Sequence, residues 1–495
     1  MKKIPCILLC LLTALAILPG LAESHNWYEV FVRSYQDGDG DGLGDLQGLS
    51  DRLDYIRDMG YDGLWLMPVM PSPSYHKYDV TDYCAIDPEY GDLADMRALV
   101  ERAHADGIRL IIDLPINHTS TRHPWFLAAC EALRDGVDSP YIAYYNFRQQ
   151  AETGFVPLEG TAWYYEERFA GGGMPDLNLD NEAVWGEIEA ILRFWLTDIG
   201  VDGFRLDAVT SFYTGDHERN IAALTRLKGL CDAIKPDTYL VGECWTGLTT
   251  IADYYRSGLR FFLFPASQAE GFIASSLRGR SGHAEKFARN YQAVLEAIPE
   301  GTLAPFLSNH DTGRTVGSVQ GRSNLAIAKF AEGVLNMMQG DVYTYYGEEI
   351  GMVGSGDDPN KRLAMYWAED DMTAQPPGVT SLEYAYPSVE TQQRDPDSLL
   401  QYCRRANQLR LKYPMIAAGE NAFLTVEGDL CVMRRSQAQG QCVIVLNFSA
   451  KDTLHYAMAD DLRMGDELTT GPEGATITEG VLTIPPYGIV ILINN

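Results

Sequence analysis

Carboxylic acids end several short apolar runs of this sequence. In the run 203–207 (GFRLD), an alternation of period two places Arg205 and Asp207 on the same face of a strand. Arg205 would favour the ionised form of Asp207, as a nucleophile requires. The run 239–243 (YLVGE) is of the buried-strand type and ends on Glu243. The two runs therefore predict a pair of acidic side chains, each at the end of a strand.

The expected placement of these acids indicates a class of chemistry. Adjacent strands lie about 5 Å apart, so Asp207 and Glu243 should approach each other if their runs are neighbours. Two carboxyl groups separated by about 5–5.5 Å can hydrolyse a glycosidic bond through a covalent intermediate, with retention of configuration. The runs ending at Asp113 and Asp311 add two more acids. Four acids at the same end of four strands favour catalysis over a structural ion pair.

The elements that must position these acids alternate along the chain. Apolar runs of the strand type alternate with amphipathic helical stretches, which is the pattern of an α/β fold with a parallel sheet. Eight such runs end near Arg33, Pro68, Asp113, Asp207, Glu243, Pro265, Asn309 and Gly347. Helices are predicted over 92–106, 181–199, 217–235, 283–297, 323–339 and 398–413. Eight βα units predict a (β/α)8 barrel of the TIM type.

Two segments depart from this alternation. The interval 117–180 is much longer than the usual loop of about 2–6 residues, which predicts a subdomain inserted after the third strand. After residue 413 the helical pattern stops and strand-like runs follow, which predicts a C-terminal all-β sandwich over 414–495. The barrel itself is then expected over 23–116 and 181–413.

The N-terminal 22 residues have the features of a secretory signal peptide. Lys2 and Lys3 precede an apolar run over 4–18, and small residues lead to a predicted cleavage site near Ala22. The run is shorter than the roughly 20 residues that a spanning helix needs, so no stable membrane insertion is expected. Seven of the nine cysteines lie beyond this segment. Their odd number, without CxxC spacing, argues against a disulfide framework or a zinc site.

The net charge of the sequence limits the kinds of molecule that the protein is expected to bind. The 495 residues include 39 Lys and Arg against 68 Asp and Glu, a formal net charge of −29. Nucleic acids and anionic membranes require clustered basic residues, so binding to either is not expected. Neutral and cationic ligands both remain compatible with this excess of acidic residues.

The motifs together resemble the α-amylase family, glycoside hydrolase family 13, over about residues 25–450. Segments 113–118 (DLPINH), 203–207, 242–243 and 309–311 (NHD) are similar to four family signatures, in the family's order. Segments 63–68 (GLWLMP) and 343–351 (YTYYGEEIG) are similar to two others. This resemblance implies a retaining double displacement, with Asp207 as nucleophile, Glu243 as acid/base and Asp311 as the transition-state stabiliser.

The same resemblance implies further contacts with the substrate. Arg205, His118 and His310 would hold the sugar that reacts. In the segment 75–79 (YHKYD), Tyr78 corresponds to the residue that stacks on this sugar. Asp79 would be able to clamp a non-reducing end, which would make the enzyme exo-acting, so endo and exo action both stay open.

Substrate choice follows from two smaller similarities. Segment 174–178 (MPDLN) resembles the family's fifth signature in a group intermediate between oligo-1,6-glucosidases and neopullulanases, which includes extracellular α-amylases. Ala208, after the nucleophile, is small, which goes with α-1,4 bonds in related glucosidases. The expected function is secreted hydrolysis of starch, glycogen or maltooligosaccharides. An exo-acting α-glucosidase or a transglycosylase of the same family is the alternative.

A barrel of this kind could instead serve as a binding protein without catalytic activity. Some barrels of this superfamily are inactive and act as binding proteins, and these have lost the acids and carry a membrane anchor. Here Asp207, Glu243 and Asp311 are all present, behind a cleavable signal. An enzyme is therefore expected.

The segment 37–45 (DGDGDGLGD) carries aspartate at alternate positions with glycine between, which suits the hard oxygen ligands of Ca²⁺. It is not an EF-hand, because a loop beginning at Asp37 would need glutamate where Gly48 stands. Its position after the first strand resembles the calcium loop of oligo-1,6-glucosidase-like members. That resemblance implies side-chain ligands from Asp37, Asp39, Asp41 and Asp45 and the carbonyl of Leu43.

Overall fold

Parallel strands form the centre of the molecule. The computed structural model describes residues 25–279, 281–438 and 440–494, so the predicted signal peptide lies outside the described residues. Seven strands pair in the order β10-β1-β2-β3-β7-β8-β9 and curl into a barrel. They are β1 (Asn26–Val30), β2 (Gly63–Leu66), β3 (Arg109–Leu114), β7 (Gly203–Leu206), β8 (Tyr239–Gly242), β9 (Arg260–Phe261) and β10 (Val342–Tyr345).

The predicted strand that ends near Asn309 is present only as isolated bridges. Ala304 bridges Phe262 after β9, and Phe306 bridges Tyr343 in β10, both in the parallel sense. Pro305 stands between them and has no N–H to donate to a ladder, which explains why a continuous strand does not form. The segment still closes the ring between β9 and β10.

The helices follow the predicted pattern closely. Those predicted are observed as α3 (Leu93–Ala105), α5 (Glu182–Arg193), α6 (His217–Ile234), α9 (His283–Ala297), α11 (Leu325–Asn336) and α14 (Leu399–Lys412). The helix predicted over 181–199 is only partly an α-helix. Its α-helical part, α5, ends at Arg193, and a π-helix follows over Phe194–Ile199. Shorter helices are α1 (Leu46–Asp51), α2 (Leu53–Asp58), α7 (Leu248–Tyr254), α8 (Phe272–Ser276), α10 (Thr315–Ser318), α12 (Asp358–Lys361), α13 (Val389–Arg394) and α15 (Met415–Ala418).

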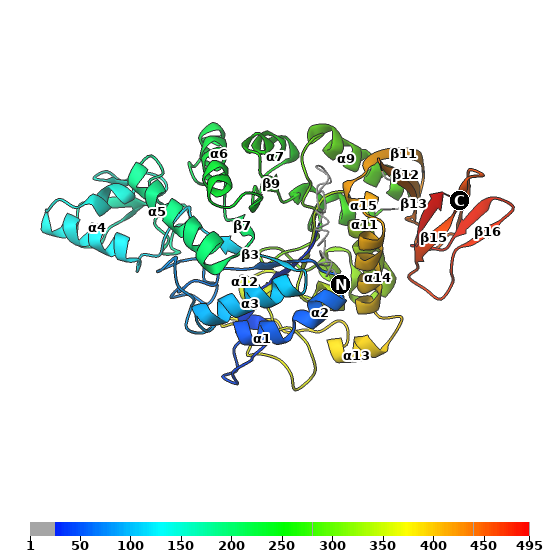
Figure 1. The fold of residues 1–495 in the computed structure, drawn as a ribbon, viewed down its shortest axis with the longest axis horizontal. Coiled ribbons are helices and arrows are strands. Elements are labelled where there is room, and N and C mark those ends of the chain that lie inside the picture. The colour runs from blue at the N-terminus through cyan, green and yellow to red at the C-terminus, as the bar shows by residue number, and fades with distance from the viewer. Residues whose placement is uncertain (1–24, 280, 439, 495) are drawn as a thin grey trace, which may run out of the picture.

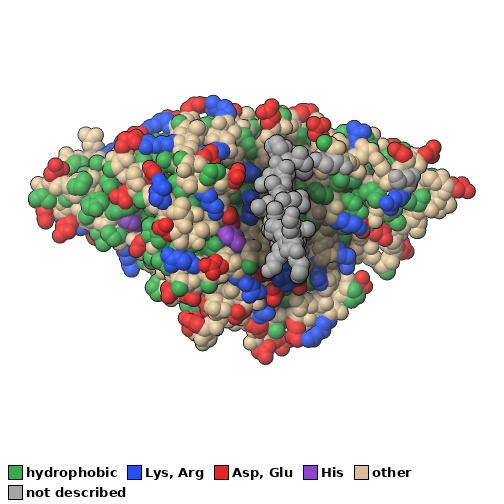
Figure 2. Space-filling view, in the orientation of Figure 1, with side chains coloured by type: hydrophobic (Ala, Val, Ile, Leu, Met, Phe, Trp, Pro, Cys, Tyr) green, Lys and Arg blue, Asp and Glu red, His purple; other side chains and the backbone are tan. Residues whose placement is uncertain are grey.

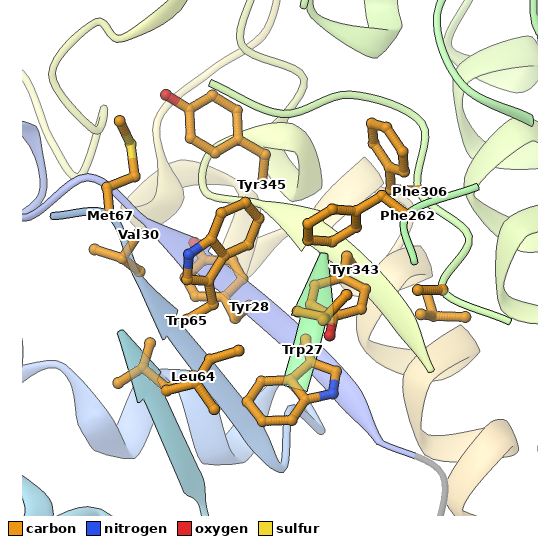
Figure 3. Packing of buried hydrophobic residues seen from close by; sticks show 14 of the residues in the cluster. Trp27, Tyr28, Val30, Leu64, Trp65, Met67, Phe262, Phe306, Tyr343 and Tyr345 are labelled. Carbon is orange, nitrogen blue, oxygen red and sulfur yellow. The ribbon is translucent and has the colours of Figure 1, made fainter. Parts of the chain in front are cut away.

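Large aromatic side chains fill the interior of the barrel (Figure 3). Trp27 and Tyr343 stack with ring centroids 5.8 Å apart, and Trp65 stacks on Phe262 at 5.2 Å. All four are at most 2% exposed. Inward-facing side chains of barrel strands pack in layers, so these rings form a solid floor under the ends of the strands. The floor reaches the site, since Trp65 contacts the ring of His310 edge-on at 5.8 Å.

Two additions lie at opposite ends of the long axis (Figure 1). After β3 the insertion contains α4 (Pro124–Asp135) and a sheet of β4 (Phe147–Arg148), β6 (Tyr164–Glu166) and β5 (Phe155–Pro157). At the other end, a five-stranded sheet faces a three-stranded one, which confirms the predicted sandwich. The first holds β11 (Glu420–Glu427), β12 (Leu430–Gln437), β13 (Gly440–Asn447), β18 (Ile489–Asn494) and β15 (Leu462–Leu468), and the second β14 (Leu454–Ala457), β17 (Val481–Ile484) and β16 (Thr476–Thr478).

Three features of the described residues bear on the class of protein. In the view of Figure 2, acidic side chains interleave with basic ones around the rim of the molecule, as a solvated surface would have them. The seven cysteines of the described ranges are all free thiols. Among those ranges, every helix is too short or too polar to cross a bilayer.

Candidate functional site

A single buried guanidinium holds the two predicted catalytic acids. Arg205, in β7, is 0% exposed. Its Nη1 donates to Asp207 Oδ1 at 2.6 Å, and its Nη2 donates to Glu243 Oε2 at 2.9 Å. Asp113, at the end of β3, accepts from Nη1 at 2.8 Å. β3, β7 and β8 are neighbours in the sheet, so adjacent strand ends bring three carboxylates around one cation.

The environment of Glu243 favours its protonated form. Burial raises the pKa of this carboxyl to about 8, Arg205 opposes the rise, and the charge of Asp207 adds to it. The backbone N–H of Ala208 donates to Glu243 Oε2 at 3.0 Å. Ala208 has a φ of 47°, in the left-handed region that a non-glycine residue adopts at a cost of about 1–3 kcal/mol. The chain thus carries local strain directly after Asp207.

Asp113 lies at the base of the site and contacts a tyrosine. Burial raises its pKa to about 7, although Arg205 lowers it. The hydroxyl of Tyr78 donates to Asp113 Oδ2 at 2.9 Å and lies 2.7 Å from His310 Nε2. The Tyr78 ring also stacks on His310, with centroids 5.6 Å apart. These bonds fix the orientation of Tyr78 at the wall of the site.

His310 lies between two carboxylates. Its Nδ1 is 2.5 Å from Glu29 Oε1, and its Nε2 is 3.0 Å from Asp311 Oδ2. Burial lowers the pKa of the imidazole, but Asp311 and Glu29 outweigh it and raise the pKa to about 9. Arg362 Nη2 donates to Asp311 Oδ1 at 2.8 Å. Burial alone would raise the pKa of Asp311. The charges of His310 and Arg362 outweigh burial and lower this pKa well below its usual range, so the carboxylate stays ionised.

The acids open into one cavity of about 430 Å³. It is lined by His76, Tyr78, His118, Phe169, Met174, Asp207, Glu243, Trp245, Asp311, Asp358, Lys361 and Arg362. The volume is within the range of small-molecule sites. The structure thereby brings the three predicted catalytic acids to one cavity.

The predicted sugar contacts divide into three groups. Tyr78 and His118 line the cavity, and His118 Nε2 is 3.2 Å from the carbonyl of Tyr78. Arg205 and His310 lie behind the acids, which they contact. Asp79 is not among the lining residues, and its Oδ1 accepts hydrogen bonds from Ser72, at 2.6 Å, and Ser74.

Several residues of the site were not found from the sequence. They are Glu29 and Arg362, which contact the His310–Asp311 pair, and the lining residues His76, Phe169, Trp245, Asp358 and Lys361. Glu29 is an acid inside β1, and its inward position in an apolar strand was a usable signal. Arg362 follows α12, and no local pattern ties this segment to Asp311. Only the closed barrel brings both residues to the His310–Asp311 pair.

The predicted metal loop brings three of its four aspartates together. One carboxylate oxygen from each of Asp37, Asp39 and Asp45 lies within 4.8 Å of the others. Asp41 lies outside this group, and its Oδ1 accepts from the N–H of Leu43 at 2.7 Å. Converging carboxylates repel one another and offer hard oxygen ligands, so the cluster fits a divalent cation.

Comparisons with known proteins agree with this geometry. The alpha-amylase catalytic-domain family matches residues 29–419. Alpha-amylase 3 of Dictyoglomus thermophilum is 32% identical, over 94% of this chain and 92% of its own. Oligo-1,6-glucosidase of Parageobacillus thermoglucosidasius is 30% identical, over 86% and 90%. The solved structure of Amy13B from Eubacterium rectale has a TM-score of 0.92 at 38% identity, covering 95% of this chain and 96% of its own. The chain therefore belongs to the alpha-amylase family, glycoside hydrolase family 13, and is a glycoside hydrolase of the amylase or glucosidase type.

Proposed function

We propose that this protein is a secreted α-glucan hydrolase that cleaves α-1,4 bonds in starch, glycogen or maltooligosaccharides with retention of configuration. The observation that carries the proposal is the pairing of Asp207 and Glu243 on the two ends of the Arg205 guanidinium. Retention requires the two carboxyl groups to lie about 5–5.5 Å apart, and their binding to one guanidinium is compatible with such a separation.

The two acids have different environments, which assigns their roles. Asp207 attacks the anomeric carbon and forms a glycosyl ester as the glycosidic bond breaks. Glu243, with a pKa raised to about 8, gives its proton to the departing oxygen. Glu243 then takes a proton from the water that cleaves the ester, which regenerates both acids. Asp311, held ionised by His310 and Arg362, would accept hydrogen bonds from hydroxyls of the distorted sugar.

One consideration favours a glucan polymer over a terminal sugar. The exo-acting alternative depends on Asp79, whose Oδ1 already accepts hydrogen bonds from two serines. Secretion is part of the proposal because residues 1–22 have the features of a signal peptide. A secreted enzyme would reach polymeric substrates that cannot enter a cell.

Maltoheptaose, with the anomeric configuration followed by NMR from the first minutes, tests this proposal. The expected products are mixed shorter oligosaccharides that are α-configured when formed. Glucose alone would indicate exo action, and a β-configured first product would rule out retention. A protein inert on soluble starch, maltooligosaccharides and pullulan would overturn the proposal.

We also propose that the loop 37–45 holds Ca²⁺. Asp37, Asp39 and Asp45 would supply carboxylates from the converging cluster. The resemblance to calcium loops of the family adds Asp41 and the carbonyl of Leu43. Bound there, the ion would offset the repulsion among these charges and fix the loop that leads from β1 into α1.

Calcium removal should lower thermal stability. A ligand at about 100 times its Kd stabilises the folded state by about 2.7 kcal/mol, so chelation should lower Tm and added Ca²⁺ should restore it. Asp39→Asn should abolish the Ca²⁺-dependent shift, because it removes a carboxylate from the cluster. The matched control is Asp138→Asn, an exposed aspartate of the insertion that should keep the shift. A Tm of the native chain that is independent of Ca²⁺ would contradict the proposal.

A further inference from the structure

An acidic side chain lies among the aromatic rings that fill the barrel. Glu29 belongs to β1 and is 1% exposed. It pairs with Trp65 of β2 on one side and with Tyr345 of β10 on the other, and Figure 3 shows both rings in the packed interior. A buried carboxylate is costly unless a partner compensates its charge. Because Glu29 is not among the residues that line the active-site cavity, any effect on the reaction must pass through another residue.

That residue is His310, which binds Glu29 twice. Its Nδ1 lies 2.5 Å from Glu29 Oε1, and its backbone N–H donates to the same oxygen at 3.4 Å. The other ring nitrogen, Nε2, lies 3.0 Å from Asp311 Oδ2 and 2.7 Å from the hydroxyl of Tyr78. Both Asp311 and Tyr78 line the cavity. The imidazole therefore connects the buried acid of β1 with two residues that face the substrate.

These contacts require a proton at each ring nitrogen. Two unprotonated groups would repel at the distance between Nδ1 and Glu29 Oε1, so a proton lies between them. Asp311 is an ionised carboxylate that only accepts, so Nε2 must donate to it. The Tyr78 hydroxyl already donates to Asp113, which leaves its oxygen to accept from Nε2. An imidazole with a single proton beside an ionised Glu29 would turn a lone pair toward one of the two carboxylates.

The charges near the ring favour retention of both protons. Although burial lowers the pKa of His310, the charges of Asp311 and Glu29 raise it to about 9. Burial also raises the pKa of Glu29, against the opposing charges of His310 and Arg205. The other charged or titratable groups around the pair are Asp113, Tyr78, Tyr345 and Arg362. Both shifts mean that the proton between Glu29 and Nδ1 stays in place at neutral pH.

We propose that Glu29 is a positioning residue, which keeps a proton on each nitrogen of His310 so that Nε2–H holds Asp311 and Tyr78 in place for the reacting sugar. The inference rests on the proposed function, in which Asp311 accepts hydrogen bonds from hydroxyls of the distorted sugar. When the pair loses its shared proton, Nε2 no longer has to carry one, and the support of Asp311 is lost. Activity should therefore fall at the pH where this proton leaves.

The pH dependence of ester formation tests this role. α-Maltosyl fluoride releases fluoride without protonation, so its kcat/KM does not need the proton of Glu243. For the wild type this kcat/KM should fall above about pH 9, as His310 loses its proton. In Glu29→Gln the amide oxygen can still accept from Nδ1–H, but the negative charge is gone. The fall should then begin about 1–3 pH units lower.

Two further variants separate charge from packing. Glu29→Asp keeps a carboxyl group on a shorter side chain, so its fall should begin closer to pH 9 than that of Glu29→Gln, whatever its kcat. The matched control is Glu332→Gln, at an acid of α11 that is 3% exposed. Burial raises the pKa of Glu332 well above its usual range, so the amide resembles the protonated acid. This variant should leave the fall near pH 9.

Proton NMR gives a readout that needs no activity. A proton in a hydrogen bond as short as that between Nδ1 and Glu29 Oε1 resonates downfield of the backbone amides. This resonance should be present in the wild type at neutral pH and disappear as the pH rises through 9. It should be absent from Glu29→Gln and present in Glu332→Gln. Should Glu29→Gln fail to fold, the wild-type titration still decides the question.

The outcomes separate this inference from the proposed function. A fall that stays near pH 9 in folded Glu29→Gln, or a wild type without the downfield proton, would overturn the role of Glu29. Wild-type cleavage of maltoheptaose would in that case leave the proposed function standing. A wild type that cleaves neither maltoheptaose nor α-maltosyl fluoride would overturn the proposed function, and with it the positioning role, even if the NMR titration showed the shared proton.

Discussion

Replacing Asp207 with asparagine is expected to lower kcat on soluble starch by about 10⁴-fold or more, which corresponds to about 5.5 kcal/mol of lost transition-state stabilisation. The amide is nearly isosteric with the carboxylate but cannot form the glycosyl ester. Arg205 would keep its hydrogen bonds to Asp113 and Glu243, so the fold should persist. Release of reducing sugar measures the effect, and circular dichroism checks the fold.

The matched control for this variant is Asp138→Asn. It makes the same chemical change at an exposed carboxylate of the insertion and should retain full activity. If Asp207→Asn kept full activity while folded, Asp207 would not be the nucleophile and another acid of the cavity would have to take its place.

The second large effect is expected for Glu243→Gln. General acid catalysis contributes about 10²–10⁴-fold, so kcat/KM for maltoheptaose should fall within that range. Cleavage of α-maltosyl fluoride should fall much less, because fluoride leaves without a proton. Added azide should restore turnover of the ester and give a glycosyl azide of the same α configuration as the substrate.

The pH profile gives an independent measure of Glu243. Since its pKa is raised to about 8, the carboxyl is protonated at and below neutral pH and loses its proton as the pH rises through 8. The wild-type kcat/KM for maltoheptaose should therefore decline above about pH 8. Glu243→Gln should lack this decline. If kcat/KM of the variant still declined above pH 8, the group that titrates would be a different one, such as His310, whose pKa is raised to about 9.

Much of the fold followed from local patterns in the sequence. Helix α9 was predicted over 283–297 and is observed over His283–Ala297, since amphipathic periodicity is a strong signal over four turns. The segment 304–306 shows a limit of such patterns. Its apolar residues predict a strand, but Pro305 breaks the ladder, so only two bridges form.

The site was predicted to the extent that it lies at strand ends. Asp207 and Glu243 end adjacent strands, and the period of two placed Arg205 on their side. Glu29 and Arg362 are different, because each reaches the site from far along the chain: Glu29 contacts His310 across 281 positions and Arg362 contacts Asp311 across 51. Such contacts depend on the closure of the barrel, which no local pattern encodes.

The pairing of β1 with β10 has a consequence for biosynthesis. Asn26 pairs with Val342, so β1 cannot complete its pairing in the barrel until the ribosome has synthesised β10. At about 5–20 residues per second, translation of the intervening 300 or so residues takes roughly 15–60 s. During that interval one edge of β1 is unpaired, and Glu29 has no imidazole to contact until His310 is made. A nascent chain released before residue 342 would thus lack both a closed barrel and an assembled set of acids, and it would expose a strand edge for chaperones or proteases to recognise.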